Sequence, residues 1–166
     1  MSIQQYIYSD TVFVVDAISK THIFELISEK LSRLSLVKKD FLNHLIERET
    51  HYPTGLDLSP IHPDLPYIAI PHTESKFVNE TRIIPIKLKQ PISFQNMIAP
   101  TEDFDVSFLF LILNHNTEVQ TNILAEIMDY LNQTNITQLQ KLFNSDNAQE
   151  IFELLTNQEE SSEDND

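Results

Sequence analysis

A nearly unbroken apolar run in the second half of the chain, VSFLFLIL at residues 106–113, sets the strongest limit on the fold. The run is far shorter than the roughly 20 residues that a membrane-spanning helix needs. In a strand, its apolar side chains would point to both sides, which is typical of a central strand in a sheet covered on both faces. We therefore predict a central strand with helices packed on either side of it.

The rest of the chain supplies the other elements of such a fold. Apolar residues at helical spacing predict a helix at residues 19–34 and a second helix that Asp40 caps and that ends before Pro53. Further helices are predicted after the central strand, at residues 116–131, 137–143 and 146–155. Short strands are predicted at residues 11–15, 67–70 and 82–88, and a proline-rich loop at residues 52–67.

The order of these elements indicates the fold class. Helices and strands are mixed without strict alternation, which favours an α/β (α+β) single domain with a mixed β-sheet flanked by helices on both faces. Apolar residues make up 41% of the 166 residues, enough for one proper core. We predict one domain over residues 1–157 and an acidic disordered tail at residues 158–166.

Charge and composition exclude several classes of function. The formal net charge is −14 at pH 7, and a nucleic-acid backbone would repel such a surface. The chain has no cysteine, so it has no disulfide, thiolate metal site or cysteine nucleophile. The first residues have neither basic residues nor an apolar segment typical of a signal peptide. We expect a soluble, cytoplasmic protein that does not bind nucleic acid.

The stretch YIAIPHTE, residues 67–74, contains the histidine with the most distinctive setting. His72 follows a short predicted strand and Pro71, whose ring restricts the backbone just before the imidazole. A nucleophile on a rigid corner and an ordinary solvent-exposed loop histidine are equally compatible with this setting. Arg48, near the end of the second predicted helix, is a second candidate, with a plain surface arginine as the alternative.

Other site types find little support in the residues. The six histidines show no spacing that would place two of them on one helix face as metal ligands. A single glycine cannot form a glycine-rich phosphate loop, and no G-x-S-x-G motif is present. Neither a P-loop enzyme nor a serine hydrolase is indicated.

Two segments together resemble a known family. LIERETHYPTG at residues 45–55, followed by YIAIPHTE, is similar to IIA components of the bacterial phosphoenolpyruvate-dependent sugar phosphotransferase system. The resemblance is to the mannitol/fructose/nitrogen-type superfamily, closest to its galactitol-type branch, and covers nearly the whole chain. Arg48 and Glu49 match the family's R-E pair, and His72 matches the histidine that is phosphorylated in the family.

The resemblance implies a phosphotransferase that relays a phosphoryl group. His72 would accept the group from the carrier HPr, acting as a neutral imidazole with a titration near about 6.5, and pass it to a cysteine of a IIB component. Arg48 would stabilise the phosphoryl oxygens, Glu49 would orient Arg48, and Thr54 would donate a hydroxyl hydrogen bond. No metal or organic cofactor is implied, and the membrane component IIC would be reached only indirectly.

Three departures from the family pattern bear on this reading. The connection at residues 59–66 is longer than usual, and Thr73 follows the histidine where many members have a smaller residue. The resemblance places Gln120 where mannitol- and fructose-type members often have a second histidine, as in the galactitol-type branch. Gln120 would then donate an amide hydrogen bond to the phosphoryl group, and His115 would not be the equivalent residue.

Two other functions stay open at this point. One is a regulatory IIA-like domain in which phosphorylation of His72 controls a partner, without feeding a transporter. The other is a non-catalytic interaction module in which His72 has no special role. The sequence does not identify the sugar, because substrate choice belongs to the membrane component.

Overall fold

The computed structural model describes residues 3–157, with the backbone alone for residues 117–121. The predicted tail at residues 158–166 lies outside the described residues. Within them, five strands form one mixed sheet in the order β1-β4-β5-β3-β2. The strands are β1 (Phe13–Val15), β2 (Gly55–Leu56), β3 (Tyr67–Ala69), β4 (Arg82–Gln95) and β5 (Asp103–Leu113). The α-helices are α1 (Lys20–Arg33), α2 (Phe41–His51), α3 (Thr117–Gln133), α4 (Ile136–Asn144) and α5 (Ala148–Thr156).

The apolar run predicted as a central strand lies in β5, at the middle of the sheet. β5 pairs with β4 in antiparallel orientation and with β3 in parallel orientation. Alternate side chains of β5 enter two separate apolar cores, Leu109 and Leu111 in one and Phe108 and Phe110 in the other. The prediction of a central strand covered on both faces is therefore confirmed.

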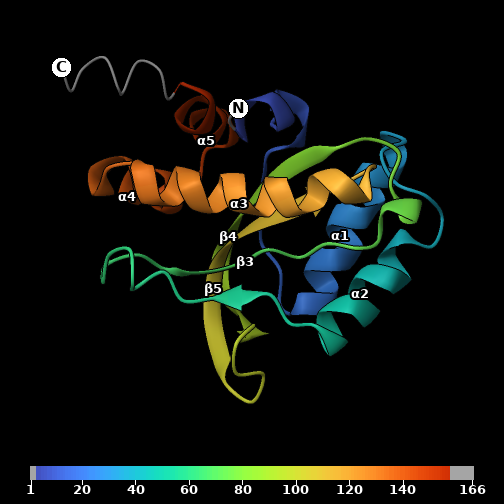
Figure 1. The fold of residues 1–166 in the computed structure, drawn as a ribbon, viewed down its shortest axis with the longest axis horizontal. Helices are drawn as coiled ribbons and strands as arrows, with labels where there is room; N and C mark the ends of the chain where they lie inside the picture. The colour runs from blue at the N-terminus through green and yellow to red at the C-terminus, as the bar shows by residue number, and fades with distance from the viewer. Residues whose placement is uncertain (1–2, 158–166) are drawn as a thin grey trace.

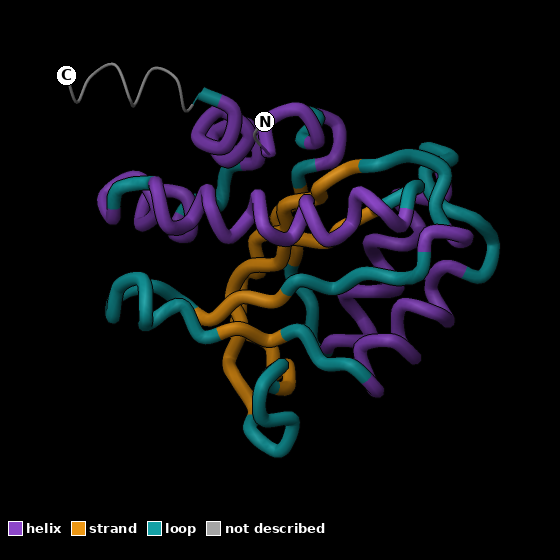
Figure 2. Tube along the Cα trace, viewed as in Figure 1, coloured by secondary structure: helices purple, strands orange, loops and turns teal. Residues whose placement is uncertain are grey.

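The helices divide between the two faces of the sheet, as Figure 1 shows. Helices α1 and α2 lie next to each other and pack with one face of the sheet around the first core. Helices α3, α4 and α5 cover the other face, together with the short 3-10 helix η1 (Ile3–Tyr6), which contacts α3 and α5. Figure 2 shows the strands between these two groups of helices. The predicted fold class, a single domain with a mixed sheet flanked by helices, is confirmed.

The helices begin close to where the sequence predicts, but the side chains that cap them are only partly the expected ones. Ser19 caps α1, because its side chain accepts a hydrogen bond from the amide of His22. Asp40 occupies the position before α2, but its side chain makes no capping hydrogen bond. Helix α5 begins at Ala148 instead of at residue 146, because Asn147 provides the cap. No described helix combines the length and the apolar character needed to cross a bilayer.

Strand β4 is twice as long as the sequence predicted, since the expectation ended at residue 88. The polar residues Lys89 and Gln90 and the following Pro91 are exposed, and they read as the end of the strand. In the structure they form an irregularity between Lys87 and Ile92, after which pairing with β5 resumes. Irregularities of this kind accommodate a proline, which has no amide hydrogen for the sheet.

The two-residue strand β2 falls inside the region predicted as a loop. Gly55 in β2 pairs with Ala69 of β3, and its carbonyl oxygen accepts a hydrogen bond from the amide of Met97 at 2.9 Å. A Cβ atom at position 55 would lie 2.5 Å from the carbonyl oxygen of Gln95. The only glycine of the chain therefore stands where the backbones of two segments come too close for any side chain.

Gly55→Ala is expected to lower the free energy of unfolding by about 1–3 kcal/mol, because the backbone of residue 95 must move away from the new methyl group. Urea unfolding followed by circular dichroism measures the effect. Ser59→Ala, at an exposed position nearby, is the matched control and should leave the midpoint within error. An unchanged midpoint for Gly55→Ala would show that this close approach is not required for stability.

Candidate functional site

His72 lies at the carboxyl end of two neighbouring parallel strands. The chain leaves β3 through Ile70 and Pro71, and His72 then forms an isolated parallel bridge with Ile112 of β5. The amide of Ile112 donates a hydrogen bond of 3.0 Å to the carbonyl oxygen of Pro71. The corner is therefore tied to the central strand, and the half-buried imidazole extends from a fixed backbone. The backbone around His72 is therefore rigid, as in the first of the two interpretations that the sequence left open.

The backbone also fixes the hydrogen position on the imidazole ring. Atom Nδ1 of His72 lies 3.0 Å from the carbonyl oxygen of Ile70. A carbonyl oxygen can only accept a hydrogen bond, so Nδ1 carries the hydrogen in this contact. Atom Nε2 of the neutral ring is then the nitrogen with a free lone pair. The sequence did not reveal this partner, because it is a main-chain atom.

Electrostatics favour the neutral form of this ring. Burial lowers the pKa of His72, the hydrogen bond to Ile70 opposes this change, and the charge of Arg48 lowers the pKa further. The sequence alone suggested a titration near the ordinary histidine value, and burial of the ring lowers its pKa from that value. Both effects favour the neutral ring, whose Nε2 lone pair is the one available for attack.

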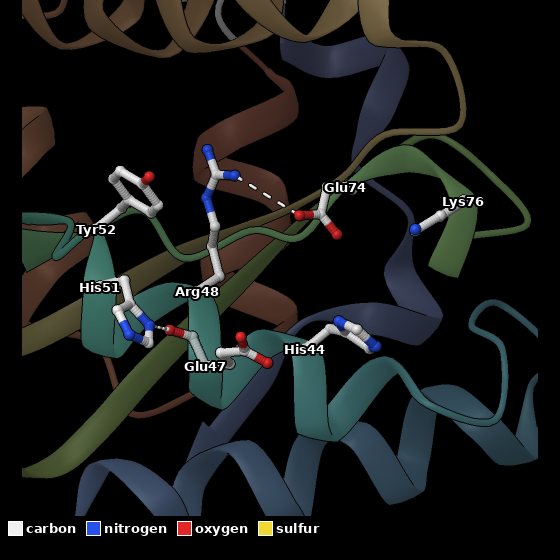
Figure 3. Close-up of a pocket in the computed structure, with 7 residues that line it drawn as sticks. All are labelled: His44, Glu47, Arg48, His51, Tyr52, Glu74 and Lys76. Atoms are coloured by element: carbon white, nitrogen blue, oxygen red, sulfur yellow. Dashed lines mark hydrogen bonds and ion pairs between the residues drawn. The ribbon is translucent and has the colours of Figure 1, made fainter.

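Arg48 lies in the last turn of α2, close enough to His72 for its charge to act on the ring. Its guanidinium lies over the ring of Tyr52, 4.8 Å from the centroid, and its Nη1 atom is 3.9 Å from Glu74. Figure 3 shows the side chain pointing from α2 toward Glu74. Its Nε atom has no hydrogen-bond partner among the described residues. The Nε atom is itself buried, and the contact of Nη1 with Glu74 is long, so no short hydrogen bond fixes the guanidinium.

A pocket of about 390 Å³ opens beside Arg48. It combines four side chains that carry or can acquire positive charge with two carboxylates and one tyrosine, and all seven are drawn in Figure 3. Among the side chains that the structure describes, no three could ligate one metal ion. The fixed charges of its lining balance, and His72 is not among the lining residues. Its lining residues are His44, Glu47, Arg48, His51, Tyr52, Glu74 and Lys76.

Glu49 and Thr54 form a buried pair rather than the contacts expected from the sequence. Both are almost fully buried, at 2% and 3% exposure. The carboxylate of Glu49 accepts two hydrogen bonds of 2.7 Å from Thr54, one from its amide and one from its hydroxyl. Glu49 thus bonds Thr54 and not Arg48, which corrects the expected orienting role. The hydroxyl hydrogen of Thr54 is engaged by Glu49 and not directed at a phosphoryl group.

The remaining candidates are less informative about the site. Gln120 lies in the first turn of α3, and its side chain falls outside the described residues. His115 is exposed, and its Nδ1 atom lies 3.3 Å from the carbonyl oxygen of Val78. The long connection at residues 59–66 is anchored by Leu58 and Leu65, which are buried in the core beneath α3.

A comparison of the sequence with family models gives one match over most of the chain. Residues 5–158 match the family described as phosphoenolpyruvate-dependent sugar phosphotransferase system, EIIA 2. No curated protein matches the sequence in a direct search. The family match is therefore the sequence comparison that bears on function.

Solved structures with the same fold agree with this match. The crystal structure of IIA mannitol from Escherichia coli is 19% identical, with a TM-score of 0.69 over 90% of this chain and 98% of that chain. The Escherichia coli complex of enzyme IIAMTL and phosphorylated enzyme IIBMTL contains a chain that is 17% identical, with a TM-score of 0.68. The match covers 91% of this chain and 97% of that chain. The nitrogen regulatory protein IIA-Ntr from Neisseria meningitidis is 19% identical, with a TM-score of 0.62. The match covers 93% of this chain and 99% of that chain. At these identities the likeness shows the fold.

Proposed function

The chain belongs to the EIIA 2 family of the phosphoenolpyruvate-dependent sugar phosphotransferase system, and we propose that it carries the phosphoryl group on Nε2 of His72. Membership makes the chain a phosphotransferase with the role of a phosphocarrier. The observation that supports His72 is the contact between its Nδ1 atom and the Ile70 carbonyl oxygen, at the end of β3. That contact leaves Nε2 as the nucleophilic atom.

The first transfer uses His72 as the attacking group. The donor is a phosphohistidine, which the family resemblance suggests is on HPr. An N–P bond breaks on the donor imidazole while a new N–P bond forms at Nε2 of His72. The Nδ1 hydrogen stays on His72, where the Ile70 carbonyl oxygen accepts it and stabilises the more positive phosphorylated ring.

The second transfer regenerates the neutral imidazole. A cysteine thiolate of a IIB component attacks phosphorus, an S–P bond forms, and the N–P bond to Nε2 breaks. The Escherichia coli complex of a similar IIA chain with phosphorylated IIB supports a IIB component as the partner. The membrane component IIC would then meet only the IIB protein.

Arg48 is proposed to stabilise the charge on the phosphoryl oxygens in both transfers. Its charge already acts on His72, and its only ion pair among the described residues, with Glu74, is 3.9 Å long, so the guanidinium is not held by a short contact elsewhere. A planar guanidinium suits two-point contact with a phosphoryl group. Stabilisation of developing charge is the main work of a protein in phosphoryl transfer.

The pH dependence of phosphoryl uptake tests His72 as the nucleophile. Uptake from the donor should fall as the pH drops through the pKa of His72, because imidazolium has no lone pair to attack with. Since burial lowers the pKa of His72, the midpoint should lie below about 6.5, the ordinary histidine value. The transfer rate is measured from pH 5 to 9, with the donor's own titration subtracted. Glu49, whose pKa burial raises to about 7, is fitted as a separate group.

We further propose the galactitol-type branch, which depends on Gln120 as a neutral group beside His72. Gln120→His would add a second titrating imidazole near the phosphoryl group, and the two rings should couple. The pH profile of the variant should then spread into two steps. A profile that superimposes on the wild-type profile would place Gln120 away from the site, remove the main support for this branch, and return His115 as a candidate.

A regulatory role is the second candidate function. The likeness in fold to the nitrogen regulatory protein IIA-Ntr favours it, since one fold serves both kinds of protein. Incubation with enzyme I, HPr and phosphoenolpyruvate should label the chain in either case. A non-catalytic interaction module would stay unlabelled. Transfer onward to a candidate IIB protein then distinguishes transport from regulation.

A further inference from the structure

We propose that Glu49 is a positioning residue for His72 and acts through Thr54 and the backbone of Ile70. This inference rests on the proposed role of His72, and it assigns Glu49 and Thr54 a different task from the one expected from the sequence. Neither side chain touches the phosphoryl group in this scheme. Together they hold the segment whose carbonyl group fixes the tautomer of the imidazole.

A continuous series of hydrogen bonds connects the buried carboxylate to the ring. Glu49 accepts the hydroxyl hydrogen of Thr54 at 2.7 Å. The same hydroxyl oxygen accepts a hydrogen bond of 3.2 Å from the amide of Ile70, which also lies 3.3 Å from the carbonyl oxygen of Thr54. The carbonyl oxygen of Ile70 then accepts the Nδ1 hydrogen of His72 at 3.0 Å. Ile70 is thus held by Thr54 on one side and holds His72 on the other.

The connection is mechanical and not electronic. The amide and the carbonyl of Ile70 belong to different peptide groups, so resonance does not carry polarisation from one to the other. The side chain of Ile70 is 1% exposed and packs in the core beneath α3. With its amide, its side chain and its carbonyl all engaged, Ile70 can turn little, and its carbonyl oxygen keeps its direction toward Nδ1.

The geometry around Glu49 requires an acceptor with two free oxygens. Both hydrogen-bond donors of Thr54 point at the carboxylate, one at each oxygen. Among the described residues Glu49 has no ion pair, although burying an unpaired carboxylate is costly. Burial raises the pKa of Glu49 to about 7, and the two bonds from Thr54 oppose this change. The charge of Lys20 also opposes it. The two short bonds to Thr54, and not an ion pair, are therefore what the buried carboxyl group of Glu49 provides.

The carboxylate of Glu49 also links the segments that carry the two proposed catalytic residues, Arg48 and His72. Glu49 follows Arg48 directly in the last turn of α2, while Thr54 lies beside the end of β3, which leads to His72. The bonds from Thr54 to Glu49 therefore tie the helix that carries Arg48 to the strand that carries His72. A change in this link should alter the ring's tautomer and the distance between the ring and the guanidinium together.

Two variants of Thr54 test the inference with a matched difference of one hydroxyl group. Thr54→Val keeps the shape and removes the hydroxyl, so phosphoryl uptake from HPr should slow about 10-fold, the usual effect of losing one hydrogen bond. Thr54→Ser restores the hydroxyl and should recover most of the rate. The tautomer of His72, measured by ¹⁵N NMR above its pKa without any donor present, should shift toward the Nε2–H form only in Thr54→Val.

Glu49→Gln provides a second test that changes volume very little. Glutamine keeps one oxygen for the amide of Thr54, but its own amide then faces the Thr54 hydroxyl, which must turn its hydrogen away from residue 49. The same slower uptake and the same tautomer shift are expected. Glu29→Gln removes an exposed carboxylate of α1 and is the control. This second pair decides the question if Thr54→Val does not fold.

The inference is overturned if Thr54→Val or Glu49→Gln keeps the wild-type tautomer, whatever its stability, because a purely structural role predicts no tautomer change. A lower melting temperature with an unchanged tautomer is therefore a negative result. Failure of the proposed function looks different, since His72→Ala would then still be labelled. The tautomer measurement needs no phosphoryl donor, so the two failures are distinguishable.

Discussion

His72→Ala is expected to abolish phosphorylation of the chain. The variant loses the atom that we propose attacks phosphorus, Nε2 of the ring whose other nitrogen is bound to Ile70. Incubation with enzyme I, HPr and labelled phosphoenolpyruvate should label the wild-type protein and leave the variant unlabelled. The wild-type label should be lost in acid and kept in base, as for a phosphohistidine.

A second histidine variant shows whether the loss is specific. His62→Ala removes a half-exposed imidazole of the long loop, whose nearest partner is Asp64. Labelling of this control should equal that of the wild type. Full labelling of His72→Ala by phosphorylated HPr would mean that another residue carries the phosphoryl group. The proposal that His72 is the phosphorylated residue would then be wrong.

Arg48→Lys is expected to slow phosphoryl transfer by roughly 10–100-fold, because lysine keeps the charge but not the planar pair of donors. The stability of the fold should hardly change, since Arg48 is partly exposed and its contact with Glu74 is 3.9 Å long. Rapid-quench measurement of phosphoryl uptake from HPr gives the rate. Chemical denaturation of the same samples checks the fold.

The matched control for this substitution is Arg33→Lys in α1. Arg33 also lies in the last turn of a helix, and it forms an exposed pair with Glu29 of the same helix. Its rate should equal that of the wild type. If Arg48→Lys or Arg48→Ala also transfers at the wild-type rate, Arg48 is an ordinary surface arginine and its effect on the pKa of His72 has no catalytic consequence.

The fold was largely predictable because its strongest features are patterns of apolar side chains. The run in β5 and the periodicity of α1 and α2 each gave the correct element within a few residues. The errors arose where main-chain geometry, and not the pattern of side chains, determines where a strand begins or ends. The exposed residues before Ile92 hid the continuation of β4, and the two-residue β2 is a strand because Gly55 pairs through its main chain with Ala69 of β3.

The candidate site shows the same division between side chains and main chain. The sequence placed His72 correctly after a strand, and it singled out Arg48, whose charge the structure brings to bear on the ring. It could not show that a carbonyl oxygen of Ile70 holds the imidazole, because every residue has such an atom. Nor could it show that Glu49 turns away from its neighbour Arg48 toward Thr54, since the direction depends on the turn after α2.

The two carbonyl groups on either side of the Pro71 ring are occupied before any phosphoryl group arrives. That of Ile70 is held by His72, and that of Pro71 by the amide of Ile112. A corner assembled in advance has little to rearrange when the N–P bond forms. In a carrier, little of the free energy stored in the donor's N–P bond is then lost in rearranging the site. Each transfer can stay close to thermoneutral and reversible, and the potential is passed on to the acceptor.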